Sequence, residues 1–163
     1  MQRQPAPLNS SARAATAAEA RYRISYPEFT RRSSRVIALD EQAAAIVRRM
    51  SGQRWSGGHF LVFESAVPGD ALLRSAIGGT ALLSEELDGA DTVVMVATAH
   101  ASAEAASIVG NACAARSIMS AGLVVPGAGS VGEVVSALRP NAMVLVVLQD
   151  AGDVPEVLSA LRV

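Results

Sequence analysis

The sequence predicts a three-layer α/β fold of the Rossmann-like kind, with a mostly parallel sheet of four to five strands. Two observations support this class. From about residue 59 onward, short apolar runs alternate with segments of helical spacing, which is the pattern of strands joined by crossover helices. Half of the residues are hydrophobic but only 4% are aromatic. The core is therefore expected to consist of small aliphatic side chains, which let helices pack closely on a sheet.

Charge is unevenly distributed along the chain and predicts two parts. Residues 1–35 carry seven arginines against two glutamates, whereas residues 36–163 carry seven arginines against thirteen acids. We predict a disordered basic leader over residues 1–34, for which an organelle transit peptide is the alternative. Residues 35–163 are expected to form a single Rossmann-like α/β domain. Because this domain is acidic, it is not expected to bind nucleic acid.

Several residue types are too rare for some classes of chemistry. The chain has no lysine, which excludes a phosphate-loop lysine and a lysine Schiff base. Its single cysteine, Cys113, can form neither an intrachain disulfide nor a cysteine-based metal site, and we expect an inert buried thiol. The lack of disulfides fits a reducing compartment. No apolar run reaches the length of a membrane span. These features predict a cytoplasmic protein that does not contact a membrane.

Each element follows from a local pattern. Asp40 can cap a helix with regularly spaced apolar positions. Another helix is expected to begin at Pro68. Residues 92–98 are continuously apolar, which is typical of a strand covered on both faces. Asp153 and Glu156 have the spacing of a capping box. Strands are expected at 36–39 (or the lead-in to a helix), 60–63, 92–98, 122–125 and 143–148, and helices at 40–50, 68–77, 82–87, 102–116, 130–139 and 153–161.

Some further residues are expected to serve packing. Ala106, Gly110 and Ala114 recur at four-residue spacing, which indicates close packing of a helix on the sheet. Trp55 is expected to cover part of the core. His59 precedes a strand, at the end of the sheet opposite to a ligand site, and is expected to be structural.

The glycine-rich segment 127–132 is the main candidate site. Gly127, Gly129 and Gly132 have the spacing G-x-G-x-x-G, between an apolar run and a short helical pattern. Glycines at these positions permit positive φ angles and a close approach of the backbone to a phosphate. Asp150 follows Gly132 by 18 residues, close to where a ribose-binding acid would lie. A tight turn followed by a capped helix is the alternative.

Two helix starts accompany this segment. Ser130 and Glu133 have the spacing of a capping box, which predicts that a helix begins there. Ser102 is a candidate N-cap in the loop that follows residues 92–98. His100, in the same loop, is the only histidine at the carboxyl end of a predicted strand. It is therefore the candidate general base, with a plain loop histidine as the alternative.

The segment 85–98 reads Glu-Glu-Leu-Asp-Gly-Ala-Asp followed by an apolar run. It resembles the acidic helix, turn and strand of the tubulin/FtsZ superfamily, and the next two apolar runs resemble the strands that follow there. This resemblance spans residues 84–150 and implies a Rossmann nucleotide-binding core. The family's phosphate loop is replaced by residues 99–104, so neither GTPase activity nor filament formation is implied. Residues 102–104 are also similar to the end of the phosphosugar loop of sugar-isomerase (SIS) modules, although His100 replaces a glycine.

These patterns predict a small non-catalytic domain that binds an anionic ligand, a nucleotide or a sugar phosphate, or that acts as a regulatory or accessory subunit. In a chain without lysine, helix N-termini and free backbone N–H groups are the visible means of binding an anion. The alternative is an enzyme acting on a nucleotide or phosphosugar, with His100 as general base. No metal site is predicted, and a protein partner or a homo-oligomer fits either function. The candidate contacts are Gly127, Gly129, Ser130, Gly132, Asp150 and Ser102.

Overall fold

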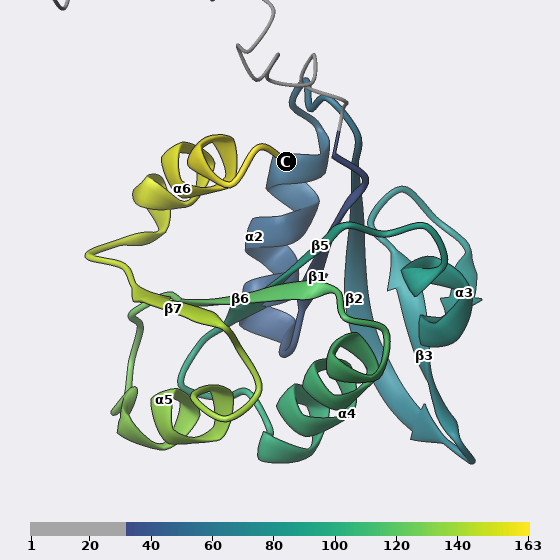
Figure 1. Cartoon of the computed structure of the whole chain (residues 1–163). Coiled ribbons are helices and arrows are strands. Elements are labelled where there is room, and N and C mark those ends of the chain that lie inside the picture. The colour runs from purple at the N-terminus through teal and green to yellow at the C-terminus, as the bar shows by residue number, and fades with distance from the viewer. Residues whose placement is uncertain (1–31) are drawn as a thin grey trace, which may run out of the picture. The chain divides into compact units, whose positions relative to one another are not determined.

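Residues 32–163 are described by the computed structural model, and they form a seven-stranded sheet with helices on both faces (Figure 1). The predicted leader, residues 1–34, lies outside the described residues except for its last three positions, and Ser34 already belongs to a strand. The elements are β1 (Ser34–Ala38), α2 (Glu41–Ser51), β2 (Gly58–Val67), β3 (Asp70–Ser75), β4 (Thr80–Leu82), α3 (Leu83–Leu87), β5 (Thr92–Ala97), α4 (Ala103–Ala115), β6 (Met119–Val124), α5 (Gly132–Leu138), β7 (Val144–Val147), the 3₁₀ turn η2 (Ala151–Asp153) and α6 (Val154–Ala160).

The strands are ordered β4-β3-β2-β1-β5-β6-β7 across the sheet. β1 lies in the middle and pairs in parallel with both β2 and β5, and β6 and β7 continue the parallel arrangement. Five strands are thus parallel, which confirms the predicted three-layer, mostly parallel α/β class. The sheet has two strands more than the largest number predicted.

The additional strands are β3 and β4, and β3 replaces the helix predicted at residues 68–77, so that prediction was wrong. β3 is antiparallel to β2, and β4 is antiparallel to β3. The first turn contains Gly69 with a φ of 76°, and the second contains Gly78 and Gly79 with φ angles of 113° and 87°. Such left-handed conformations suit the tight turns of hairpins. The short apolar pattern fits the period of a helix as well as that of a strand, so pairing with β2 decides that this segment is a strand.

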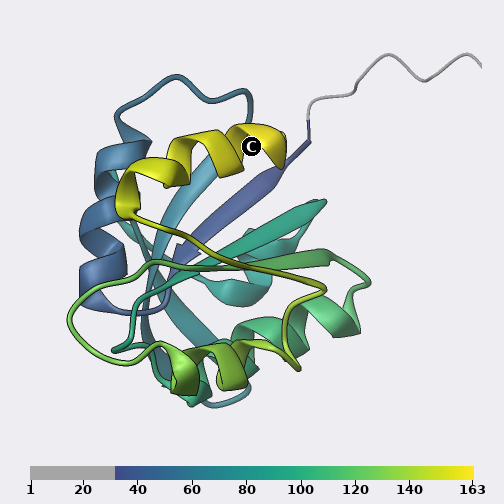
Figure 2. The ribbon, with the colours of Figure 1, turned by 90° about the vertical axis from the view of Figure 1, so that its left-hand side faces the viewer.

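Two hydrophobic clusters lie on opposite faces of the sheet. α2 and α6 cover one face, where Val47 and Leu158 are fully buried. α3, α4 and α5 cover the other, with Leu87, Val109 and Leu138 buried. Figures 1 and 2 show the two groups of helices on either side of the sheet. Within residues 32–163, none of the helices has the length and apolar character needed to span a bilayer.

Trp55 closes the end of the first cluster, beyond the last turn of α2. Its Nε1 donates a hydrogen bond to the carbonyl oxygen of Met50 at 2.7 Å, and its ring lies 5.7 Å from that of Phe60 between centroids. The side chain is partly buried against the cluster. This confirms the predicted role of Trp55 as a partial cover for the core.

Gly110 of α4 permits a close approach by the turn that precedes β7. A Cβ atom at Gly110 would lie 2.5 Å from the Cβ of Asn141 and 2.9 Å from its carbonyl oxygen. Ala106 is buried like Gly110, whereas Ala114 is exposed. At Gly110 the stripe of small residues therefore packs against a turn and not against the sheet, which corrects the predicted helix–sheet contact.

We expect Gly110→Ala to lower the free energy of unfolding by about 1–3 kcal/mol, because the added methyl group must displace the backbone of a packed turn. Gly52→Ala is the matched control: Gly52 ends α2, and the nearest heavy atom to an added Cβ would be 3.7 Å away. The control should change stability by less than about 0.5 kcal/mol. Urea denaturation followed by circular dichroism measures both, and equal stabilities of the two variants would contradict the packing described.

Candidate functional site

The loops after β1, β5, β6 and β7 lie at one side of the sheet, which we call the carboxyl edge (residues 39–43, 98–104, 125–133 and 148–156). In doubly wound sheets, ligands bind beyond the carboxyl ends of the strands, where neighbouring crossovers leave for opposite faces. β1 and β5 are neighbours, and the helices that follow them, α2 and α4, cover opposite faces. The switch point therefore lies between residues 39–41 and 98–102.

The carboxylate of Asp40 occupies this switch point. Its Oδ1 accepts a hydrogen bond from the backbone N–H of Ala43 at 2.9 Å, which caps α2 as predicted. Its two oxygens also accept bonds from the N–H of Thr98 at 2.7 Å and from the Thr98 hydroxyl at 2.9 Å. The bonds to Thr98 were not predicted, because 58 residues separate the partners. Only the parallel pairing of β1 with β5 brings them together.

The glycine-rich segment 127–132 lies against the loop that follows β5. Gly129 has a φ of 123°, and a Cβ atom there would lie 3.3 Å from the Cβ of Ala99. A Cβ atom at Gly127 would lie 3.7 Å from Oε1 of Gln42, in the first turn of α2. Residues 126–130 are exposed. Three loops of the carboxyl edge thus meet at the candidate site.

The capping box predicted at Ser130 is not formed. α5 begins at Gly132, and its N-cap is Val131, which makes no side-chain capping bond. Glu133 is then the second residue of the helix and not the third, so it does not stand in the position that bonds back to the cap. The Ser130 hydroxyl instead accepts a hydrogen bond from the N–H of Gly132 at 3.3 Å. Ser130 remains exposed at the candidate site.

Ser102 caps α4, as the sequence predicted. Its hydroxyl accepts a hydrogen bond from the N–H of Ala105 at 3.1 Å. His100 is exposed in the same loop, and its backbone N–H donates to the Thr98 hydroxyl at 3.3 Å. Within the described residues, the His100 imidazole has no hydrogen-bond or ion-pair partner. No group there orients it as a general base requires.

Asp150 is exposed, and its carboxylate accepts a hydrogen bond from the N–H of Gly152 in the turn η2. The carboxylate of Asp153 bonds back to the N–H groups of Gln149 and Asp150 at 3.3 and 3.2 Å. It makes no capping bond to α6, so the capping box predicted for Asp153 and Glu156 is wrong. The Asp153 carboxylate instead caps the 3₁₀ turn that precedes α6.

The carboxyl edge is strongly acidic. Because each parallel strand ends there and the next helix begins there, the acids in the first turns of the helices collect at this edge, where they interact favourably with the helix dipoles. The four segments of the edge contain no arginine, and their histidine is His100. Within the described residues, no group of three or more His, Cys, Asp or Glu side chains could hold a metal ion. The acids of the edge are Asp40, Glu41, Glu104, Glu133, Asp150, Asp153 and Glu156.

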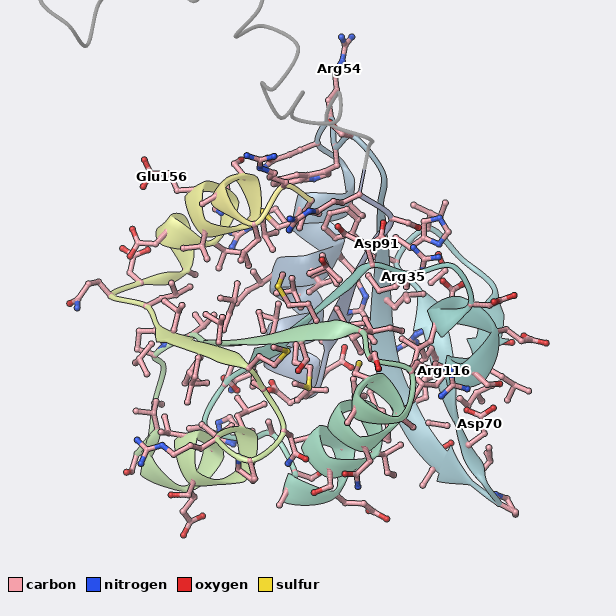
Figure 3. The ribbon with its side chains drawn as sticks, in the orientation of Figure 1. Arg35, Arg54, Asp70, Asp91, Arg116 and Glu156 are labelled. Atoms are coloured by element: carbon pink, nitrogen blue, oxygen red, sulfur yellow. The ribbon has the colours of Figure 1, made fainter. Side chains whose placement is uncertain are left out.

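Ionic contacts at the opposite, amino edge join β1 to its surroundings. Arg35 is buried, and its Nε lies 3.1 Å from Oε2 of Glu86 in α3. The same carboxylate lies 3.0 Å from Nδ1 of His59, which agrees with the structural role expected for this histidine. Asp91 accepts a bond from the N–H of Ser33 at 3.0 Å. Figure 3 shows Arg35 and Asp91 on this side of the molecule.

Arg116, at the end of α4, lines a groove of about 460 Å³ that no sequence pattern indicated. Asp70 and Ser84 line the same groove, and Figure 3 shows Asp70 close to Arg116. The pKa of Asp70 is lowered, chiefly because the Ser84 hydroxyl donates a hydrogen bond to its carboxylate. The backbone N–H groups of Ala71 and Ser84 donate to it as well. Because Asp70 is engaged by donors of this chain, we assign the groove no ligand.

The comparisons with known proteins give no family. No protein-family model, curated protein or solved structure matches this chain. The resemblance of residues 84–150 to the tubulin/FtsZ core therefore stays a prediction, as does the similarity of residues 102–104 to the sugar-isomerase loop.

We expect Asp40→Ala to lower the free energy of unfolding by about 2–4 kcal/mol, because it removes a helix cap and leaves the buried N–H of Thr98 without its acceptor. Ser102→Ala removes a cap alone and should cost about 1 kcal/mol. Guanidinium denaturation of both variants measures the difference. Losses of the same size would show that the bonds between Asp40 and Thr98 contribute nothing.

Cys113 is fully buried, and burial raises the pKa of its thiol to about 11. At pH 8 only about one thiol in a thousand is then ionised. We expect the folded protein to resist iodoacetamide at this pH and the urea-unfolded chain to be alkylated once. Mass spectrometry measures both, and alkylation of the folded protein at the rate of the unfolded one would contradict the burial.

Proposed function

We propose that this chain is a small non-catalytic Rossmann-like domain that binds a nucleotide or a sugar phosphate at its carboxyl edge. The proximity of Gly129 to Ala99 carries this proposal, because the glycine-rich segment lies beside the loop that leads into α4. Gly127, Gly129 and Gly132 expose backbone without Cβ atoms. Such a segment lets a phosphate approach N–H groups closely.

The charge of the edge restricts the form of the ligand. Its segments carry seven carboxylates, including Asp40 and Glu104, and no arginine. A bare phosphate is repelled by this field, and a divalent cation bound to the phosphate reduces that repulsion. We therefore expect a ligand that brings magnesium with it. Asp150 is exposed and follows Gly132 by 18 residues, close to the spacing of a ribose-binding acid. We expect its carboxylate to accept a hydrogen bond from a ribose hydroxyl.

A regulatory or accessory role agrees with the surroundings of His100. Because no group in the described residues orients the His100 imidazole as a base, binding is the function that we propose in place of catalysis. Ligand occupancy would then change how the domain contacts a protein partner, and we expect it to do so in the cytoplasm.

Thermal unfolding of the full chain with ATP, GTP or glucose 6-phosphate, each with and without magnesium chloride, tests the proposal. A ligand at ten times its Kd stabilises by about 1.4 kcal/mol, which is about 5 °C for a domain of this size. We expect this rise for at least one compound, and only with magnesium. No rise at millimolar concentration for all three would overturn the proposal.

Two matched variants locate the site. Gly127→Asp adds a negative charge to the glycine-rich segment, where a Cβ atom has ordinary van der Waals space, and should abolish the rise. Gly52→Asp adds the same charge at the exposed end of α2 and should retain it. His100→Ala should also retain the rise. A rise that survives in Gly127→Asp would place the ligand elsewhere.

A further inference from the structure

β7 is the outermost strand on one side of the sheet, and in the described residues it pairs with β6 alone. An edge strand presents unpaired N–H and C=O groups to a further strand. Proteins usually protect such edges with charged side chains. β7 has no such protection, because residues 140–149 contain no charged side chain. Figure 1 shows β7 at the outer side of the sheet, between α5 and α6.

The side chains of this edge are apolar and exposed. Met143 is 76% exposed, Val144 42% and Val147 48%. Leu145 packs into the cluster under α5, and Val146 into the cluster under α6. Because side chains alternate along a strand, Val144 faces the α6 side and Val147 the α5 side. In the part of the chain that the structure describes, both faces of the sheet therefore end in exposed apolar side chains.

The charges at the two ends of β7 complement each other. Arg139 precedes the strand and is exposed, and within residues 32–163 its guanidinium has no ion-pair partner. Asp150 and Asp153 follow the strand, and among residues 32–163 their carboxylates accept hydrogen bonds only from backbone N–H groups. An antiparallel copy of the same strand would bring Arg139 of each chain toward the aspartates of the other. A parallel neighbour would place like charges side by side.

We propose that β7 pairs in antiparallel fashion with β7 of a second copy, so that two sheets join into one across a two-fold axis perpendicular to the sheet. Such an interface is isologous, since each copy contributes the same residues. The axis keeps α5 beside α5 and α6 beside α6. It covers Val144 and Val147 on their respective faces and pairs the open backbone groups. This association does not depend on the proposed ligand.

Sedimentation equilibrium of the full chain tests the pairing. The wild-type protein should have twice the mass of one 16.8 kDa chain at micromolar concentration. Val144→Lys and Val147→Lys place a charge on the edge and should each give the mass of a single chain. Ile77→Lys is the matched control, because Ile77 is 87% exposed in the hairpin turn, far along the sheet order from β7. It should remain dimeric.

A charge reversal tests the antiparallel direction. Arg139→Glu should raise the Kd of the dimer by about tenfold or more at low salt, because it replaces attraction between the ends of β7 by repulsion. Arg54→Glu reverses an exposed arginine away from this edge and should leave the Kd unchanged. A monomeric wild-type chain, or dimers that survive a lysine in β7, would overturn the pairing itself. An unchanged Kd for Arg139→Glu would overturn its direction.

Discussion

The carboxylate of Asp40 joins the start of α2 to the end of β5, at the point where the two halves of the parallel sheet meet. Backbone N–H groups that leave a sheet lose their partners there, and a buried one without an acceptor costs about 1–3 kcal/mol. Thr98 is buried, so its donors need this carboxylate. By holding Thr98, Asp40 sets the path of the loop that leads to Ser102. That loop in turn contains Ala99, which lies close to Gly129.

The same architecture sorts the charges of the domain. Helices that follow parallel strands all begin at one edge and run back toward the other. Acids favour the first turns and arginines the last, as Glu41 with Arg48 and Arg49 in α2 illustrate. Arg116 and Arg139 follow the ends of α4 and α5 in the same way. An acidic edge is therefore a consequence of stabilising individual helices. It restricts the chemistry of any ligand that binds there.

The apolar runs located the five parallel strands, although at residues 36–39 a short apolar run fitted the start of a helix as well, and its pairing with β2 and β5 decides that it is a strand. The region 68–77 was predicted wrongly, since a short segment with apolar residues at mixed spacing takes its structure from its neighbour β2. Helix caps differ in the same way. The cap at Ser102 was predicted correctly from local spacing, whereas the cap predicted at Ser130 was wrong, because the preceding loop ends one residue later, at Val131. The contacts that assemble the candidate site, from Asp40 to Thr98 and from Gly129 to Ala99, join residues distant in the sequence. No local pattern reveals them.

Trp55 is the only tryptophan of the chain, and its indole is held at the end of α2 by the Met50 carbonyl and the Phe60 ring. It lies at the amino edge, on the side of the sheet away from the glycine-rich segment. Its fluorescence will therefore report the loss of the α2–β2 packing when the domain melts. The emission will not change when a molecule occupies the carboxyl edge of the folded protein. Because of its position, Trp55 thus gives a fluorescence signal for unfolding that is independent of ligand binding at the carboxyl edge.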